Sequence, residues 1–180
     1  MSSTEGHTVV PTCPNWTVRD MVEHYGQTQH WVSQILEDRI IDPAQLTTQY
    51  AELPADSQDW PGWLSEAASR ATATCTDAAM QAQVFNAAGD ERTGGQFWLL
   101  SLLKETVLHG YDAAVAAGTQ RDYTIDDDVA AELISNHLTM LTSPTWATQR
   151  PDSAAALHGN GETLLCHATD EPGSATSRDG

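Results

Sequence analysis

The sequence predicts an all-α protein, built as an up-and-down bundle of amphipathic helices. Apolar residues recur at steps of three and four in four long segments, at residues 18–39, 60–84, 98–117 and 126–141. Prolines, glycines and polar residues separate these segments, and the one strand-like run, TLLCHA, lies near the end of the chain. With 180 residues the chain is long enough to form one domain with a hydrophobic core.

The first predicted helix covers residues 18–39. Thr17 suits the N-cap position, and Asp20, three residues later, is placed to complete a capping box. His24 lies at the edge of the apolar stripe of this helix, so its side chain can face the interior of a bundle. The stripe contains Val18, Met21, Val22, Tyr25, Val32, Ile35 and Leu36.

The remaining helices follow from turn signals and periodicity. Residues 42–59 hold two prolines and form a long connection, with one helical turn expected around residues 44–50. The second helix begins at Trp60 and continues to about residue 84, before a glycine-rich loop over residues 86–95.

The third predicted helix ends at Gly118, which suits the first position after a helix. The fourth begins at three aspartates, residues 126–128, which the helix dipole favours at an N-terminus, and Pro144 ends it. Beyond residue 150 the helical pattern stops, and the last residues have a composition typical of disorder.

The third helix carries a candidate metal site. Glu105 and His109 are four residues apart on the face that also contains Asp112, so both can reach one divalent ion. His24 is the best candidate for a third ligand, and a His2Glu set with an open position is typical of a catalytic zinc. Two alternatives stay open: the pair is an ordinary surface pair, and the lone histidine is structural.

Composition limits the partners. Asp and Glu total 25 against 8 Lys and Arg, a formal net charge of −17 that argues against nucleic acid or an anionic membrane as partner. The acidic balance reflects either a salt-adapted source or a GC-rich genome that avoids lysine codons. No apolar run is long enough to span a membrane, and the N-terminus lacks the features of a signal peptide, so we expect a cytoplasmic protein.

Two stretches resemble one family. The first is VPTCPNWTVRDMVEHYGQTQHWVSQIL, and the second is KETVLHGYDAA. Both are similar to motifs of the mycothiol-dependent maleylpyruvate isomerase N-terminal domains, within the DinB/YfiT-like superfamily. The resemblance places metal ligands on His24, Glu105 and His109, and it places the acidic motif residue on Asp112. The later run LHGNGETLLCHATDEPG is similar to the start of a small C-terminal α/β domain.

The resemblance implies a DinB/YfiT-like four-helix bundle over residues 1–150, with a short, vestigial extension over residues 151–180. It implies a divalent metal, most often Zn²⁺, with a low-molecular-weight thiol such as mycothiol as co-substrate. The expected activity is a transferase or cis–trans isomerase acting on a small electrophile, with Asp112 holding a ligand imidazole. The alternatives are a metal-dependent hydrolase, and a non-catalytic bundle or partner subunit.

The chain departs from the family pattern in three ways: its N-terminal segment is short, Gly110 stands where a basic residue commonly follows the second histidine, and the C-terminal domain is expected to be cut short after Asp170. Only about ten residues precede the Pro-Thr-Cys-Pro segment, where family members usually have a full helix. Basic groups for a carboxylated substrate are few: Arg19, Arg92 and Lys104. The shortened N-terminus predicts an uncovered apolar face on the first helix, formed by Val22, Trp31 and Val32, and a two-fold homodimer through that face.

Overall fold

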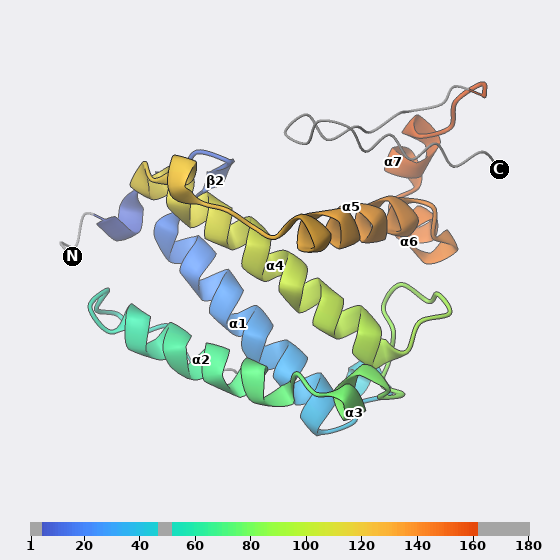
Figure 1. Cartoon of the computed structure of the whole chain (residues 1–180), viewed down its shortest axis with the longest axis horizontal. Helices are drawn as coiled ribbons and strands as arrows, with labels where there is room; N and C mark the ends of the chain where they lie inside the picture. The colour runs from blue at the N-terminus through green and yellow to red at the C-terminus, as the bar shows by residue number, and fades with distance from the viewer. Residues whose placement is uncertain (1–4, 47–51, 162–180) are drawn as a thin grey trace.

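The computed structural model describes residues 5–46 and 52–161, which fold mainly into helices (Figure 1). The predicted all-α bundle is confirmed. In chain order the elements are η1 (Glu5–His7), β1 (Val9–Val10), β2 (Cys13–Thr17), α1 (Val18–Glu37), η2 (Pro43–Gln45), α2 (Trp60–Thr74), α3 (Asp77–Met80), α4 (Gly94–Ala117), η3 (Gln120–Asp122), α5 (Asp127–Leu141), α6 (Pro144–Gln149) and α7 (Pro151–Ala156). No helix in the described ranges is long and apolar enough to cross a membrane.

Helix α1 lies between α2 and α4 (Figure 1). Near the start of α1, the Arg19 guanidinium lies 5.9 Å from the ring centre of Trp60, the first residue of α2. Near the end of α1, Glu37 pairs with Arg70 in the last turns of α2, at 2.6 Å. Helices α1 and α2 therefore run in the same direction, while α4 runs the opposite way and α5 lies along the outer side of α4.

The predicted N-cap of α1 is confirmed. The Thr17 side chain accepts from the Asp20 backbone N–H, and the Asp20 carboxylate accepts from the Thr17 backbone N–H at 2.8 Å. This reciprocal pairing satisfies two backbone groups that would otherwise be unpartnered at a helix start. The helix begins directly after strand β2, so the capping box also fixes how the N-terminal hairpin joins α1.

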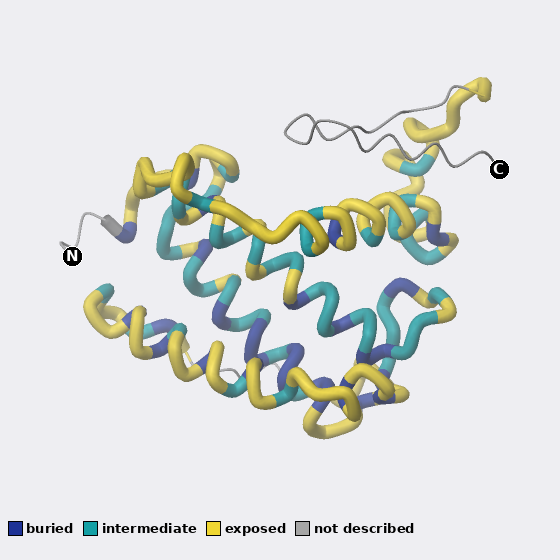
Figure 2. Tube along the Cα trace, viewed as in Figure 1, coloured by how far each residue is buried: buried dark blue, intermediate teal, exposed yellow. Residues whose placement is uncertain are grey.

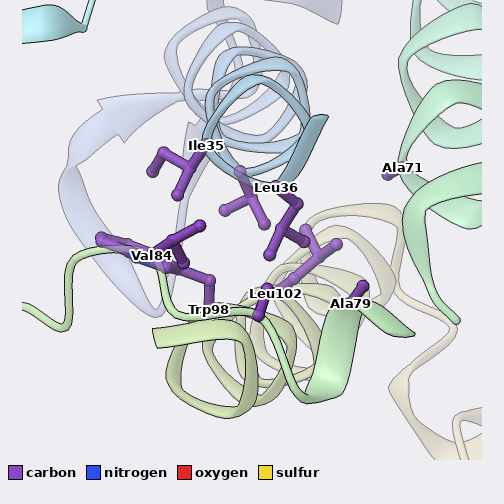
Figure 3. Packing of buried hydrophobic residues seen from close by; sticks show 9 residues of the cluster. Ile35, Leu36, Ala71, Ala79, Val84, Trp98 and Leu102 are labelled. Atoms are coloured by element: carbon purple, nitrogen blue, oxygen red, sulfur yellow. The ribbon is translucent and has the colours of Figure 1, made fainter. Parts of the chain in front are cut away.

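The main core fills the space between α1, α3 and the first half of α4. Figure 3 shows Ile35 and Leu36 of α1, Trp98 of α4 and Val84 of the segment between α3 and α4 pointing toward one another. Trp98 is only 5% exposed, and its indole N–H donates to the Phe85 carbonyl at 2.8 Å, which removes the cost of burying that polar group. Figure 2 shows buried residues concentrated on α1, whereas α2 and α5 expose their outer sides.

The second predicted helix is wrong in its length. It ends at Thr74 rather than near residue 84, and a separate short helix, α3, follows. Thr76 adopts an extended backbone and its side chain accepts from the Ala79 backbone N–H at 3.1 Å, so this threonine caps a new helix instead of continuing the old one. After α3 the chain takes a new direction, and Val84 packs in the main core.

Helix α4 begins one turn earlier than periodicity indicated, at Gly94. A Cβ on Gly94 would lie 2.1 Å from the Val84 carbonyl oxygen, so only glycine allows this close approach. The helix ends as predicted: Gly118 has φ +74, a left-handed conformation that favours glycine at a helix C-terminus.

Three further expectations fail or fall outside the described residues. The N-terminal segment contains a short antiparallel hairpin, β1 with β2, that the sequence reading treated as irregular. Helix α5 ends at Leu141, before Pro144, as predicted, but helical structure continues beyond that point: Pro144 opens α6, whose N-cap is Ser143, and α7 covers Pro151–Ala156, where the helical pattern was expected to stop. The strand-like run at residues 163–168 and most of the expected extension lie outside the described residues.

The uncovered apolar face predicted on α1 is also wrong. Val32 is 1% exposed, within the main core. Trp31 packs edge-to-face on Trp98 at 4.7 Å, and Val22 packs against the cluster that contains Trp60 and Trp63. The chain's own helices cover this face, so the reason given for a homodimer through it no longer applies.

Candidate metal centre

Three side chains from distant parts of the sequence converge between α1 and α4. His24 Nε2 lies 3.1 Å from Glu105 Oε2, and His109 Nε2 lies 3.2 Å from the same oxygen. One ligand atom of each residue lies within 4.8 Å of the others. These are the three residues that the sequence analysis named as ligands; that they bind a metal stays a prediction.

Antiparallel packing of α1 against α4 explains the convergence. His24 lies in the second turn of α1, and Glu105 and His109 occupy successive turns from the middle of α4 onward. Because the two helices run in opposite directions, the beginning of one meets the end of the other (Figure 1). The helical spacing that aligns Glu105 with His109 then aims both at the same point on α1.

Asp112 contacts the His109 imidazole on the side of the ring away from Glu105. Its Oδ2 lies 2.9 Å from His109 Nδ1, on the ring edge opposite the Glu105 contact. The second carboxylate oxygen, Oδ1, accepts from the Thr12 hydroxyl at 2.5 Å. Asp112 is 8% exposed, so this network is fixed inside the protein. The arrangement leaves Nε2 as the nitrogen of His109 directed toward the site, as metal-binding histidines require.

Hydrogen bonding changes the titration of two of these groups. The contacts to His109 and then to His24 lower the pKa of Glu105, against the opposing effect of burial. The pKa of His109 is raised, first by its hydrogen bond to Glu105 and then by that to Asp112, against burial. Without a metal, these contacts therefore favour the ionised carboxylate of Glu105 and the protonated imidazole of His109.

Aromatic residues surround the two histidines. The Trp16 ring stacks on His109 with centroids 5.8 Å apart, and its edge contact with His24 is 4.9 Å. Tyr25 lies 6.3 Å from His109 and its hydroxyl donates to the Thr106 hydroxyl at 3.1 Å. The His24 side chain is 41% exposed, so solvent reaches the cluster from that residue's side.

Sequence reasoning missed the roles of Thr12 and Trp16. Both belong to the N-terminal hairpin, which pairs Val10 with Cys13 and carries these side chains toward the last turns of α4. The only signal in the sequence is Trp16 directly before the N-cap, a position from which it can reach neighbouring helix ends. Spacing along one helix cannot reveal contacts contributed by a hairpin.

Of the three basic residues expected near the site, one lies beside it. Lys104 Nζ is 3.4 Å from Glu105 Oε1. Arg19 instead lies over Trp60 on the α2 side of α1, and Arg92 pairs with Asp90 in the loop before α4 at 2.5 Å. Of these three basic side chains, Lys104 is therefore the one that lies at the cluster.

The donor set fits a divalent metal. Bond lengths of about 2.0–2.2 Å from zinc to imidazole nitrogen and carboxylate oxygen place neighbouring ligand atoms roughly 3 to 4 Å apart. The two separations to Glu105 Oε2, 3.1 and 3.2 Å, lie in that range. Two neutral imidazoles and one carboxylate are also the ligand types that zinc prefers at a site with a free position.

These features describe a helical-bundle protein with a two-histidine, one-glutamate cluster between antiparallel helices. The family model described as the mycothiol maleylpyruvate isomerase N-terminal domain matches residues 2–114, which contain every member of the cluster. The chain belongs to this family. Searches of curated proteins and of solved structures gave no match.

Proposed function

We propose that this protein is a metal-dependent enzyme that uses a low-molecular-weight thiol such as mycothiol. It would either transfer the thiol to a small electrophile or catalyse cis–trans isomerisation of that electrophile. In this proposal His24, Glu105 and His109 hold one divalent ion, most simply Zn²⁺. The observation that carries it is the shared contact of both imidazoles with Glu105 Oε2, at 3.1 and 3.2 Å. Membership of a mycothiol-related family supports the choice of thiol.

A bound divalent ion supplies Lewis acidity, which lowers the pKa of a thiol so that thiolate is available near neutral pH. The chain's own residues prepare that site. Asp112 fixes the ring of His109 and favours a proton on Nδ1, which leaves Nε2 free to bind. Trp16 covers the two imidazoles on one side, where it excludes water, while the exposed side of His24 offers an approach for thiol and substrate.

Lys104 gives the site a preference for anionic electrophiles. Its ammonium group is 3.4 Å from Glu105 Oε1 and partly exposed, so it can also contact a substrate carboxylate. When Glu105 binds a cation, its attraction for Lys104 weakens, which makes the ammonium group more available. We also propose that residues 1–150 form the metal-binding bundle and residues 151–180 an extension to it.

The test begins with protein purified without chelators and dialysed. We expect about one equivalent of zinc per chain, and mycothiol-dependent isomerisation of maleylpyruvate that is lost on metal removal and restored by zinc. A protein that retains no divalent metal would refute the proposal. Retained zinc without any thiol-dependent turnover would refute the enzymatic part, and would favour a non-catalytic bundle.

A further inference from the structure

A groove between α2 and α4, floored by α1, encloses a cavity of about 310 Å³. The residues that α2 contributes to the groove are small and include Ala68 and Ala71. Leu102 and Leu103 form part of the α4 side, and Gln29 belongs to the α1 floor. The volume lies at the lower end of the range for small-molecule sites, about 300–1,000 Å³.

The lining of this groove is uncharged. Among the described residues that line it, none is acidic or basic, although the chain as a whole has a net charge of −17. Leucine, alanine and threonine side chains make up most of the wall. A ligand portion that fits the groove must therefore be neutral and largely apolar, because a charge there would lose its hydration without gaining a partner.

Gln29 adds a specific polar feature. This residue is 3% exposed, and its Oε1 is buried with no hydrogen-bond partner among the described residues. The main-chain carbonyl of Gln29 accepts from the Ser33 hydroxyl at 2.8 Å, so of the two oxygens of this residue it is Oε1 that lacks a partner. Buried polar atoms are nearly always paired, so this oxygen indicates a ligand with a hydroxyl or amide N–H donor.

One end of the groove lies beside the candidate metal centre. Tyr25 and Thr106 line the groove, and they directly follow His24 and Glu105 in the sequence. Their hydroxyls are hydrogen-bonded at 3.1 Å across the α1–α4 contact. A ligand lying in the groove would thus have one end next to the Tyr25 hydroxyl, one residue from a ligand of the proposed metal.

We propose that this groove binds the body of the substrate, a neutral and largely apolar group whose hydroxyl or amide N–H donates to Gln29 Oε1. The reactive end of the substrate then lies at the Tyr25 end, toward the metal centre. The role of that reactive end rests on the proposed function. Binding in the groove itself requires no metal, so the two proposals can fail separately.

The test uses two probes that differ in one hydrogen-bond donor, 4-ethylphenol and its methyl ether 4-ethylanisole. Each is titrated into the isotope-labelled full chain, metal-free and zinc-loaded, while amide chemical shifts are recorded. We expect 4-ethylphenol to shift the Gln29 side-chain amide and the backbone amides of Ala68 and Leu102 in both forms. The ether should bind about five- to tenfold more weakly, as expected for one lost hydrogen bond.

Two variants sharpen the result. Gln29→Met keeps the size of the side chain and should remove the difference between the probes. Ala68→Phe, at an exposed position on the groove wall, should block both probes while the helical circular dichroism is retained. Equal affinity for the two probes, shifts confined to α5, or unchanged binding by Ala68→Phe would each overturn the proposal. Failure of the metal proposal alone would appear as probe binding without zinc retention.

Discussion

His109 and Asp112 form a fixed pair on the last turns of α4, with Nδ1 and Oδ2 2.9 Å apart. Since Thr12 donates to the other oxygen of Asp112, the imidazole is held in one orientation from outside the candidate site. Positioning of this kind is worth about 10- to 100-fold in metal affinity in characterised metal sites. The consequences can be measured directly.

Asp112→Ala should weaken zinc binding by about 10- to 100-fold, because His109 would lose the group that orients its ring. Thr12→Val should cause a smaller loss, since Asp112 would remain in contact with His109. Competition against a chromogenic chelator measures both affinities. If Asp112→Ala binds zinc as tightly as the wild type, the pair has no supporting role.

Glu105→Ala should abolish tight metal binding while the helix content is unchanged. Two histidines alone form a weak site, and the carboxylate is the group that contacts both of them. Glu132→Ala, an exposed glutamate on α5, is the matched control and should keep the wild-type metal content. A Glu105→Ala protein that retains one equivalent of zinc through dialysis would contradict the assignment.

The titration of the cluster predicts opposite pH effects on the metal-free protein. The lowered pKa of Glu105 contributes stability that is present above pH 4.5. This stability is lost as the pH falls through the pKa of Glu105 in the folded protein. The raised pKa of His109 contributes stability that is present below pH 6.5. This stability is lost as the pH rises through the pKa of His109 in the folded protein.

The affinity for zinc should change with pH in the opposite direction to the stability that His109 contributes. The metal competes with the proton on Nε2, so affinity should rise as the pH increases through the folded pKa of His109. Urea denaturation of metal-free protein and zinc titrations across the same pH series measure the two effects. In His109→Gln the loss of stability on the alkaline side should disappear; its persistence would assign that loss to another group.

Two glycines provide a matched test of the packing. A Cβ on Gly26 of α1 would lie 2.0 Å from Trp63 Cζ3, so Gly26→Ala must displace a buried indole. We expect a destabilisation of about 1–3 kcal/mol, typical of overpacking. Gly62 has no atom within 4 Å of such a Cβ, so Gly62→Ala should be neutral or stabilising by up to about 1 kcal/mol. Thermal or urea denaturation compares the pair, and equal effects would contradict the packing described.

The sequence was most informative where local rules act alone. Helical periodicity and capping chemistry predicted the start of α1 at Thr17 and the end of α4 at Gly118. It also selected Glu105 and His109 as a pair, because helical spacing makes them neighbours whatever surrounds them. His24 was selected on weaker grounds, since its pairing with them depends on how α1 and α4 pack.

Features that depend on tertiary contacts were not predictable in the same way. From the sequence, Thr76 could continue the helix that contains residues 60–74. In the structure it instead caps α3, and α2 ends before it. The contact of Thr12 with Asp112 joins residues 100 positions apart, through a hairpin too short to give a clear pattern. Val22 and Trp31 are covered by tryptophans from α2 and α4. The sequence of α1 alone gives no sign of these contacts.

Anomalous diffraction from crystals grown with zinc, recorded above and below the zinc absorption edge, can show whether one divalent ion is held by His24, Glu105 and His109. We expect one peak per chain within about 2.0–2.2 Å of both Nε2 atoms and a Glu105 oxygen. A zinc peak at other residues, or no peak at this cluster in crystals of protein that contains zinc, would contradict it.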